Sequence, residues 1–202
     1  MIGLSQHADA PRRVLVLVIG NILWGDEGFG VRAVERFHAR YRVPDHVTVL
    51  DGGTQGLYLV QFVNEADDLI IFDAIDYGME PGRMKVVRDA EVPKFTGAKK
   101  MSLHQTGFQE VLSAADLMGS YPDRLALIGC QPLDLEDWGG PLTEPVAQAI
   151  DRAIETAVGI LADWGVECVP RDDKEMDVPG LLGHDIDQVS YERRPGLGRD
   201  YA

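Results

Sequence analysis

Short runs of apolar residues recur along the chain at intervals that are typical of buried strands. The runs at 14–19, 47–50, 69–72 and 125–130 consist mainly of Val, Ile and Leu. Continuous runs of this kind, without polar alternation, indicate strands covered on both faces, as in a parallel sheet. A shorter and more polar run at 84–88 predicts a strand at the edge of the sheet.

The segments between these runs show the spacing of amphipathic helices. Apolar residues at Val31, Val34, Phe37 and Tyr41 lie on one helical face, and similar patterns follow at 57–64, 108–118 and 146–161. Because strands and helices alternate, we predict a three-layer α/β domain with a mostly parallel sheet.

The two ends of the chain lack such patterns. Residues 1–12 are predicted to be an N-terminal lead-in, and residues 13–170 form the predicted domain. Beyond residue 170 charges mix with glycines and Pro195 without any periodicity. We therefore predict that residues 171–202 form a disordered tail.

Charge and composition narrow the possible partners and the compartment. The chain has 202 residues and a formal net charge of −14, which argues against binding to nucleic acid or to an anionic membrane surface. No apolar run approaches the length of a membrane span. Cys130 and Cys168 are isolated, without any Cys-x-x-Cys motif, so a reducing cytoplasm is the expected location.

A glycine-rich turn follows the first predicted strand, with Gly25, Gly28 and Gly30 before the helix. The turn matches neither the P-loop nor the dinucleotide-binding pattern. Asp26 and Glu27 stand where a phosphate would lie at the helix N-terminus. These two acids would repel a phosphate and attract a cation, so a nucleotide site is disfavoured.

Several ionisable residues follow the predicted strands. Glu27 comes after the first strand, Asp51 after the second, and Asp73 and Asp76 after the third, while His104 begins a later helix. Ligands of parallel α/β sheets bind outside the carboxyl ends of the strands, so these side chains are candidates for a common site. Each aspartate could instead form a turn or cap a helix, and His104 could be a hydrogen-bonded surface residue.

Glu27, Asp73 and His104 together form a predicted metal site with one nitrogen and two carboxylate ligands. A helix N-terminus favours the neutral imidazole that a metal ion requires. Mixed oxygen and nitrogen ligands suit zinc, nickel or another first-row dication. Two further residues have simpler interpretations: Cys130 is expected to be buried filler, and Trp138 to anchor a loop, although it could line a binding surface.

Five segments carry a resemblance that runs from Val14 to Pro170. They are Gly20–Arg32, Asp51–Gly56, Asp73–Gly78, Ser102–Gln105 and Gly139–Leu142. In this order they resemble the endopeptidases that mature the large subunit of nickel-iron hydrogenases, in particular the branch that serves membrane-bound uptake hydrogenases. The resemblance implies a twisted, mainly parallel five-stranded sheet flanked by helices.

The same resemblance implies an activity and a set of functional residues. Such enzymes remove a C-terminal extension from the large-subunit precursor after nickel insertion, cutting after a His or Arg. Glu27, Asp73 and His104 match the family's metal-site positions, and Asp51 matches a further functional position. The nickel is expected to be carried by the precursor, and Asp51, Asp73 or Glu27 could be the catalytic base.

Two other hypotheses remain open from the sequence. The chain could be a self-contained metallo-hydrolase with its own zinc, although it has no His-Glu-x-x-His motif. It could also be a non-catalytic, metal-dependent chaperone of the precursor.

Overall fold

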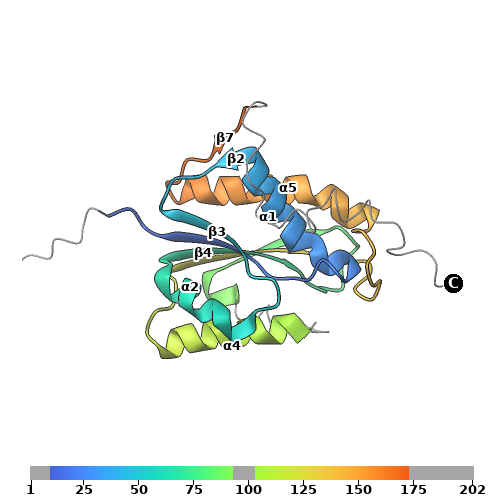
Figure 1. The fold of residues 1–202 in the computed structure, drawn as a ribbon, viewed down its shortest axis with the longest axis horizontal. Coiled ribbons are helices and arrows are strands. Elements are labelled where there is room, and N and C mark those ends of the chain that lie inside the picture. Colours follow the sequence, from blue (N-terminus) through green and yellow to red (C-terminus); the bar gives the residue numbers. More distant parts are fainter. Residues whose placement is uncertain (1–9, 93–102, 173–202) are drawn as a thin grey trace, which may run out of the picture.

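A five-stranded sheet forms the centre of the computed structural model, which describes residues 10–92 and 103–172, and side chains from 10–92 and 108–172. The strand order is β3-β1-β4-β6-β5, in which the first four strands are parallel and β5 is antiparallel to β6 (Figure 1). The strands are β1 (Val14–Val18), β3 (Val47–Asp51), β4 (Asp68–Ala74), β5 (Met84–Arg88) and β6 (Arg124–Cys130). The predicted mainly parallel sheet, with its polar strand at the edge, is confirmed.

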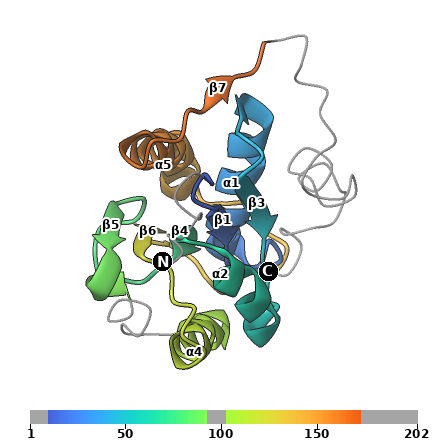
Figure 2. The same ribbon diagram turned by 90° about the vertical axis from the view of Figure 1, so that its left-hand side faces the viewer.

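Helices cover both faces of this sheet. On one face lie α1 (Phe29–Arg40) and α5 (Glu144–Asp163), and on the other lie α2 (Val60–Glu65) and α4 (Leu103–Leu117), as Figures 1 and 2 show. Within the described residues, the connections also contain the short 3-10 helices η1 (Gly25–Gly28), η2 (Gly56–Leu59) and η3 (Asp89–Glu91). Because each strand alternates its side chains between the faces, the core divides into two clusters, one beneath each helical layer.

Two strands are longer than the apolar runs predicted. β4 continues to Ala74, so Asp73 lies inside the strand and pairs with Gly129 of β6. β3 likewise ends at Asp51, which pairs with Val18. Both aspartates therefore have their backbones fixed by the sheet, whereas the sequence placed them in the following turns.

Helix α1 approaches the sheet closely at Gly30. A Cβ atom there would overlap with Cγ2 of Val18 and would lie 2.7 Å from the carbonyl oxygen of Phe72. The glycine is therefore required by the close approach of α1, and this approach brings the turn before α1 against the ends of β1 and β4.

Two features lie at the borders of the predicted domain. Arg12 pairs with Asp68 and with Asp123, each at 2.8 Å, at the amino ends of the strands. An unpredicted two-stranded sheet joins β2 (Tyr41–Arg42) to β7 (Val169–Pro170). Most of the predicted tail, 173–202, lies outside the described residues, and none of the described helices is long and apolar enough to cross a membrane.

Candidate active site

The four parallel strands end at one edge of the sheet, where the connecting turns are bonded to one another. The amide of Gly52, after β3, donates to the carbonyl of Val18 at the end of β1, at 3.0 Å. The amide of Ile19 donates to the carbonyl of Phe72 in β4 at 3.2 Å. The ends of β1, β3 and β4 are therefore held together at one edge, where β3 ends at Asp51 and β4 carries Asp73 near its end.

The sequence led us to expect that both Asp26 and Glu27 attract a cation at the turn before α1. For Asp26 this expectation is wrong. Its side chain is fully buried and accepts hydrogen bonds from the amides of Leu133 and Asp134, at 2.8 and 3.0 Å. It also accepts from the amide and the hydroxyl of Thr143, at 2.7 and 3.0 Å. Asp26 therefore fixes the loop that connects β6 to α5.

Glu27 is the second carboxylate of this turn, and its side chain is half-buried. Its backbone amide donates to the carbonyl of Trp24 at 2.8 Å, which fixes the residue within η1. Burial of the half-buried side chain raises the pKa of Glu27 to about 7. A nearby cation would stabilise the charged form of such a carboxylate, so Glu27 is suited to meet a metal ion.

Asp73 is buried on the face of the sheet that α2 and α4 cover. Its side chain is 6% exposed, and its neighbours of the same parity in β4, Leu69 and Ile71, belong to the core cluster beneath these helices. α4 begins at the same edge of the sheet, and His104 is its second residue (Figure 1). The side chain of His104 lies outside the described residues.

Asp51 points to the opposite face of the sheet. It shares the parity of Val47 and Val49 in β3, which pack in the cluster beneath α1 and α5. Its Oδ1 accepts a hydrogen bond from the amide of Gly53 at 2.9 Å. Burial raises the pKa of Asp51, although this amide bond and the charge of Arg32 in α1 oppose the rise.

The structure thus brings the four predicted residues to one edge but on different faces of the sheet. Within the described side chains, no three His, Cys, Asp or Glu residues gather into a metal-binding group. The predicted metal site requires the side chain of His104, which lies outside the described residues. The site therefore stays a prediction.

Gln131 is a structural residue of the site that sequence reasoning missed. Its Oε1 accepts from the amides of Tyr77 and Met79, at 2.7 and 3.1 Å, and its Nε2 donates to Asp76 at 3.0 Å. It therefore ties the turn after β4 to the end of β6. The only signal in the sequence was a polar residue directly after the apolar run at 125–130.

Cys130 is buried in the core, as the sequence predicted. Burial, reinforced by the charge of Asp26, raises the pKa of its thiol to about 12. A thiol that stays protonated at neutral pH is a poor nucleophile, so the geometry offers no support for cysteine catalysis here.

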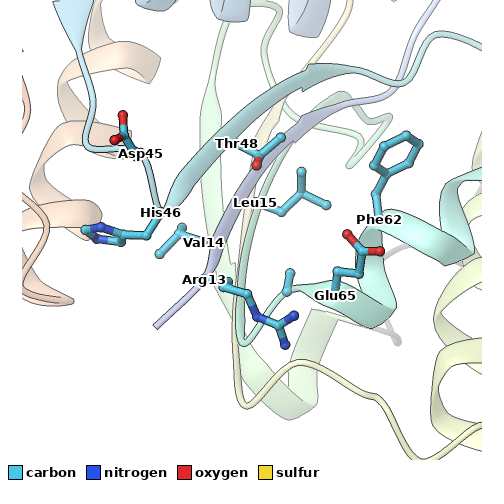
Figure 3. A pocket seen from close by; sticks show the side chains of 9 residues that line it. Arg13, Val14, Leu15, Asp45, His46, Thr48, Phe62 and Glu65 are labelled. Atoms are coloured by element: carbon cyan, nitrogen blue, oxygen red, sulfur yellow. The ribbon is translucent and has the colours of Figure 1, made fainter. Parts of the chain in front are cut away.

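A cavity of about 180 Å³ lies away from these residues. Arg13, His46 and Glu65 line it at the amino ends of β1 and β3 and the end of α2, as Figure 3 shows. It is at the opposite edge of the sheet from Glu27 and Asp73, so it is not the predicted site.

The fold and this edge define an α/β protein whose candidate chemistry lies in carboxylates at the ends of parallel strands. A profile of the family described as hydrogenase maturation protease matches residues 31–160. The chain is 74% identical over 185 residues to the hydrogenase expression/formation protein HupD of Rhizobium leguminosarum bv. viciae, covering 92% of this chain and 91% of the relative. It is 46% identical to the hydrogenase 2 maturation protease of Escherichia coli, over 79% of this chain and 97% of that protein.

Comparison with solved structures indicates the same family. The hydrogenase maturating endopeptidase HybD from E. coli superposes with a TM-score of 0.76 and 44% identity, covering 80% of this chain and 99% of that one. The chain belongs to the hydrogenase maturation protease family. It is a hydrolase, an endopeptidase that acts in hydrogenase maturation.

Proposed function

We propose that this endopeptidase removes the C-terminal extension from the precursor of a nickel-iron hydrogenase large subunit after nickel has been inserted. The observation that carries the proposal is the half-buried carboxylate of Glu27, whose pKa is raised to about 7 at the edge where β4 and α4 bring Asp73 and His104. Both free thiols, Cys130 and Cys168, are consistent with a reducing cytoplasm as the place of this reaction.

In this proposal nickel is part of the substrate. The precursor's own ligands hold the ion, and Glu27, Asp73 and His104 approach it to complete its coordination shell. Two oxygens and one nitrogen fit nickel and leave positions for the ligands that the precursor brings. The three residues would then align the peptide bond that follows the metal-binding segment of the precursor.

Asp51 has a separate role in the proposal, because it lies outside this ligand set. It ends the strand next to β1 at the same edge, and burial raises its pKa, which favours acceptance of a proton. We assign it as the base that takes a proton from the attacking water. The products are the mature large subunit with a new carboxylate and the released extension with a new amine.

The decisive experiment compares nickel-loaded and nickel-free precursor. Metal-free enzyme is incubated with each form in the presence of a chelator too weak to strip the precursor, and the C-terminal mass of the precursor is measured. We expect shortening of the nickel-loaded form alone. Glu27→Ala, Asp73→Ala and His104→Ala should abolish it, whereas Glu155→Ala, which removes an exposed carboxylate of α5, should not.

The other two hypotheses predict different outcomes of the same experiment. Equal cleavage of both precursor forms, with a metal ion bound tightly by the enzyme alone, would favour a self-contained zinc hydrolase. Binding of the precursor without any change in its mass would favour a non-catalytic chaperone. Family membership favours neither of them.

A further inference from the structure

Trp138 is a large aromatic side chain that the fold holds at the surface. It lies in the loop between β6 and α5, and it is 55% exposed. The sequence predicted that Trp138 anchors a loop, which would bury most of its ring, with a binding surface as the alternative. Exposed tryptophans that are held in place are common energetic centres of protein interfaces.

The backbone of Trp138 is fixed against the turn after β1. Trp138 forms a β-bridge with Trp24, and the amide of the next residue, Gly139, donates to the carbonyl of Leu23 at 2.8 Å. The rings of Trp24 and Trp138 meet edge to face, with centroids 4.6 Å apart and an interplanar angle of 78°. The ring is therefore supported on one side and exposed on the other.

This support connects Trp138 to Glu27. The carbonyl of Trp24 accepts the amide hydrogen of Glu27 at 2.8 Å, so one residue contacts both. The buried carboxylate of Asp26 holds the start and the end of the same loop through Leu133, Asp134 and Thr143. Trp138 and Glu27 thus belong to one rigid unit at the edge of the sheet.

Charge indicates what this surface binds. Residues 131–142 contain three acids, Asp134, Glu136 and Asp137, and no Lys, Arg or His. Glu136 and Asp137 are exposed next to Trp138 in the sequence, and Leu23 is exposed on the neighbouring turn. A tryptophan face flanked by carboxylates is complementary to a segment that carries both basic and apolar side chains, because cations bind aromatic faces as well as carboxylates.

We propose that Trp138 binds the hydrogenase precursor, through a segment with basic and apolar residues, and holds it next to Glu27. The inference rests on the proposed function for the identity of the partner. In this proposal Trp138 acts away from the reacting atoms, so it contributes to binding of the precursor and not to the chemical step.

The test measures binding and cleavage separately. Binding of nickel-loaded precursor is titrated with protein carrying Asp51→Asn, which removes the proposed catalytic base, with and without Trp138→Ala. We expect Trp138→Ala to weaken binding about tenfold or more, as truncation of an aromatic interface residue does. In otherwise wild-type enzyme it should raise KM by a similar factor and leave kcat unchanged.

Two variants control for a merely structural effect. Trp138→Phe keeps an aromatic ring against Trp24 and should recover most of the affinity. Leu117→Ala removes an apolar side chain that is 90% exposed at the far end of α4, and should leave binding unchanged. Added salt should weaken binding of the wild type, because the flanking contacts are ionic.

The outcomes separate this inference from the proposed function. Unchanged affinity and KM in Trp138→Ala would overturn the inference even if the wild type cleaves the precursor. A fall in kcat at constant KM would also overturn it. If the wild type binds the precursor through Trp138 but leaves its mass unchanged, the binding surface stands and the proposed cleavage falls.

Discussion

The carboxylate of Asp26 accepts hydrogen bonds from both the amide and the hydroxyl of Thr143, which lies 117 residues further along the chain. Thr143 directly precedes α5, and Asp26 belongs to the 3-10 turn before α1. One buried carboxylate therefore joins the starts of the two helices that cover the same face of the sheet. This contact fixes the geometry of the turn that presents Glu27.

Asp26→Asn should destabilise the protein by about 2–4 kcal/mol. The amide group replaces one acceptor oxygen by a donor, which then faces the amides of Leu133 and Asp134 or of Thr143 in a buried position. Urea unfolding followed by circular dichroism measures the change.

Asp134→Asn is the matched control, because its Oδ1 accepts exposed amides from Glu136 and Asp137. It should cost less than about 1 kcal/mol. Equal losses in the two variants would show that burial of Asp26 does not set its contribution.

Substitution by alanine should change the stability of the protein in opposite directions at two glycines. At Gly30 a methyl group would overlap with Val18 and the Phe72 carbonyl, so Gly30→Ala should destabilise by about 2 kcal/mol or more. At Gly159 in α5 nothing lies within 4 Å of an added Cβ, so Gly159→Ala should stabilise by about 0.5–1 kcal/mol through helix propensity.

Thermal unfolding of the two alanine variants beside the wild type provides the comparison. If Gly30→Ala were as stable as the wild type, α1 would not lie as close to β1 and β4 as described.

Cys130→Ala should leave precursor cleavage intact. The thiol is fully buried, and its pKa is raised to about 12 by burial and by the charge of Asp26. Folded protein should therefore resist alkylation at this position at neutral pH, as peptide mapping after iodoacetamide treatment would show. Abolished cleavage in a variant that still unfolds cooperatively would contradict this assignment and point to a thiol mechanism.

The sequence predicted the sheet well because buried parallel strands consist of apolar runs, and those runs mark β1, β4 and β6 directly. The sequence pattern placed Asp51 and Asp73 just outside their strands, because a carboxylate does not indicate that a strand continues. Both residues extend their strands through backbone pairing with other strands, which a local sequence pattern does not contain. The same limit applies to Asp26. Within Gly25–Gly28 two adjacent acids look equivalent, and only contacts from the distant β6–α5 loop distinguish the buried one from Glu27.

Glu27 should make stability depend on pH between about 4.5 and 7. Burial raises its pKa from 4.5 to about 7, so the folded state binds a proton more tightly than the unfolded state does. The contribution to the free energy of unfolding is fully present below pH 4.5 and is lost as the pH rises through 7. Glu27→Gln stays neutral and avoids this loss, so its stability relative to the wild type should increase across this window.

Urea unfolding at several pH values in the presence of a chelator measures this difference, with the exposed Glu136→Gln as control. The free energy of unfolding of the Glu136 variant should change with pH as that of the wild type does. The same pH dependence in the Glu27 variant would contradict the assigned pKa. The pH dependence would thus report the same property that suits Glu27 to meet the nickel of the precursor.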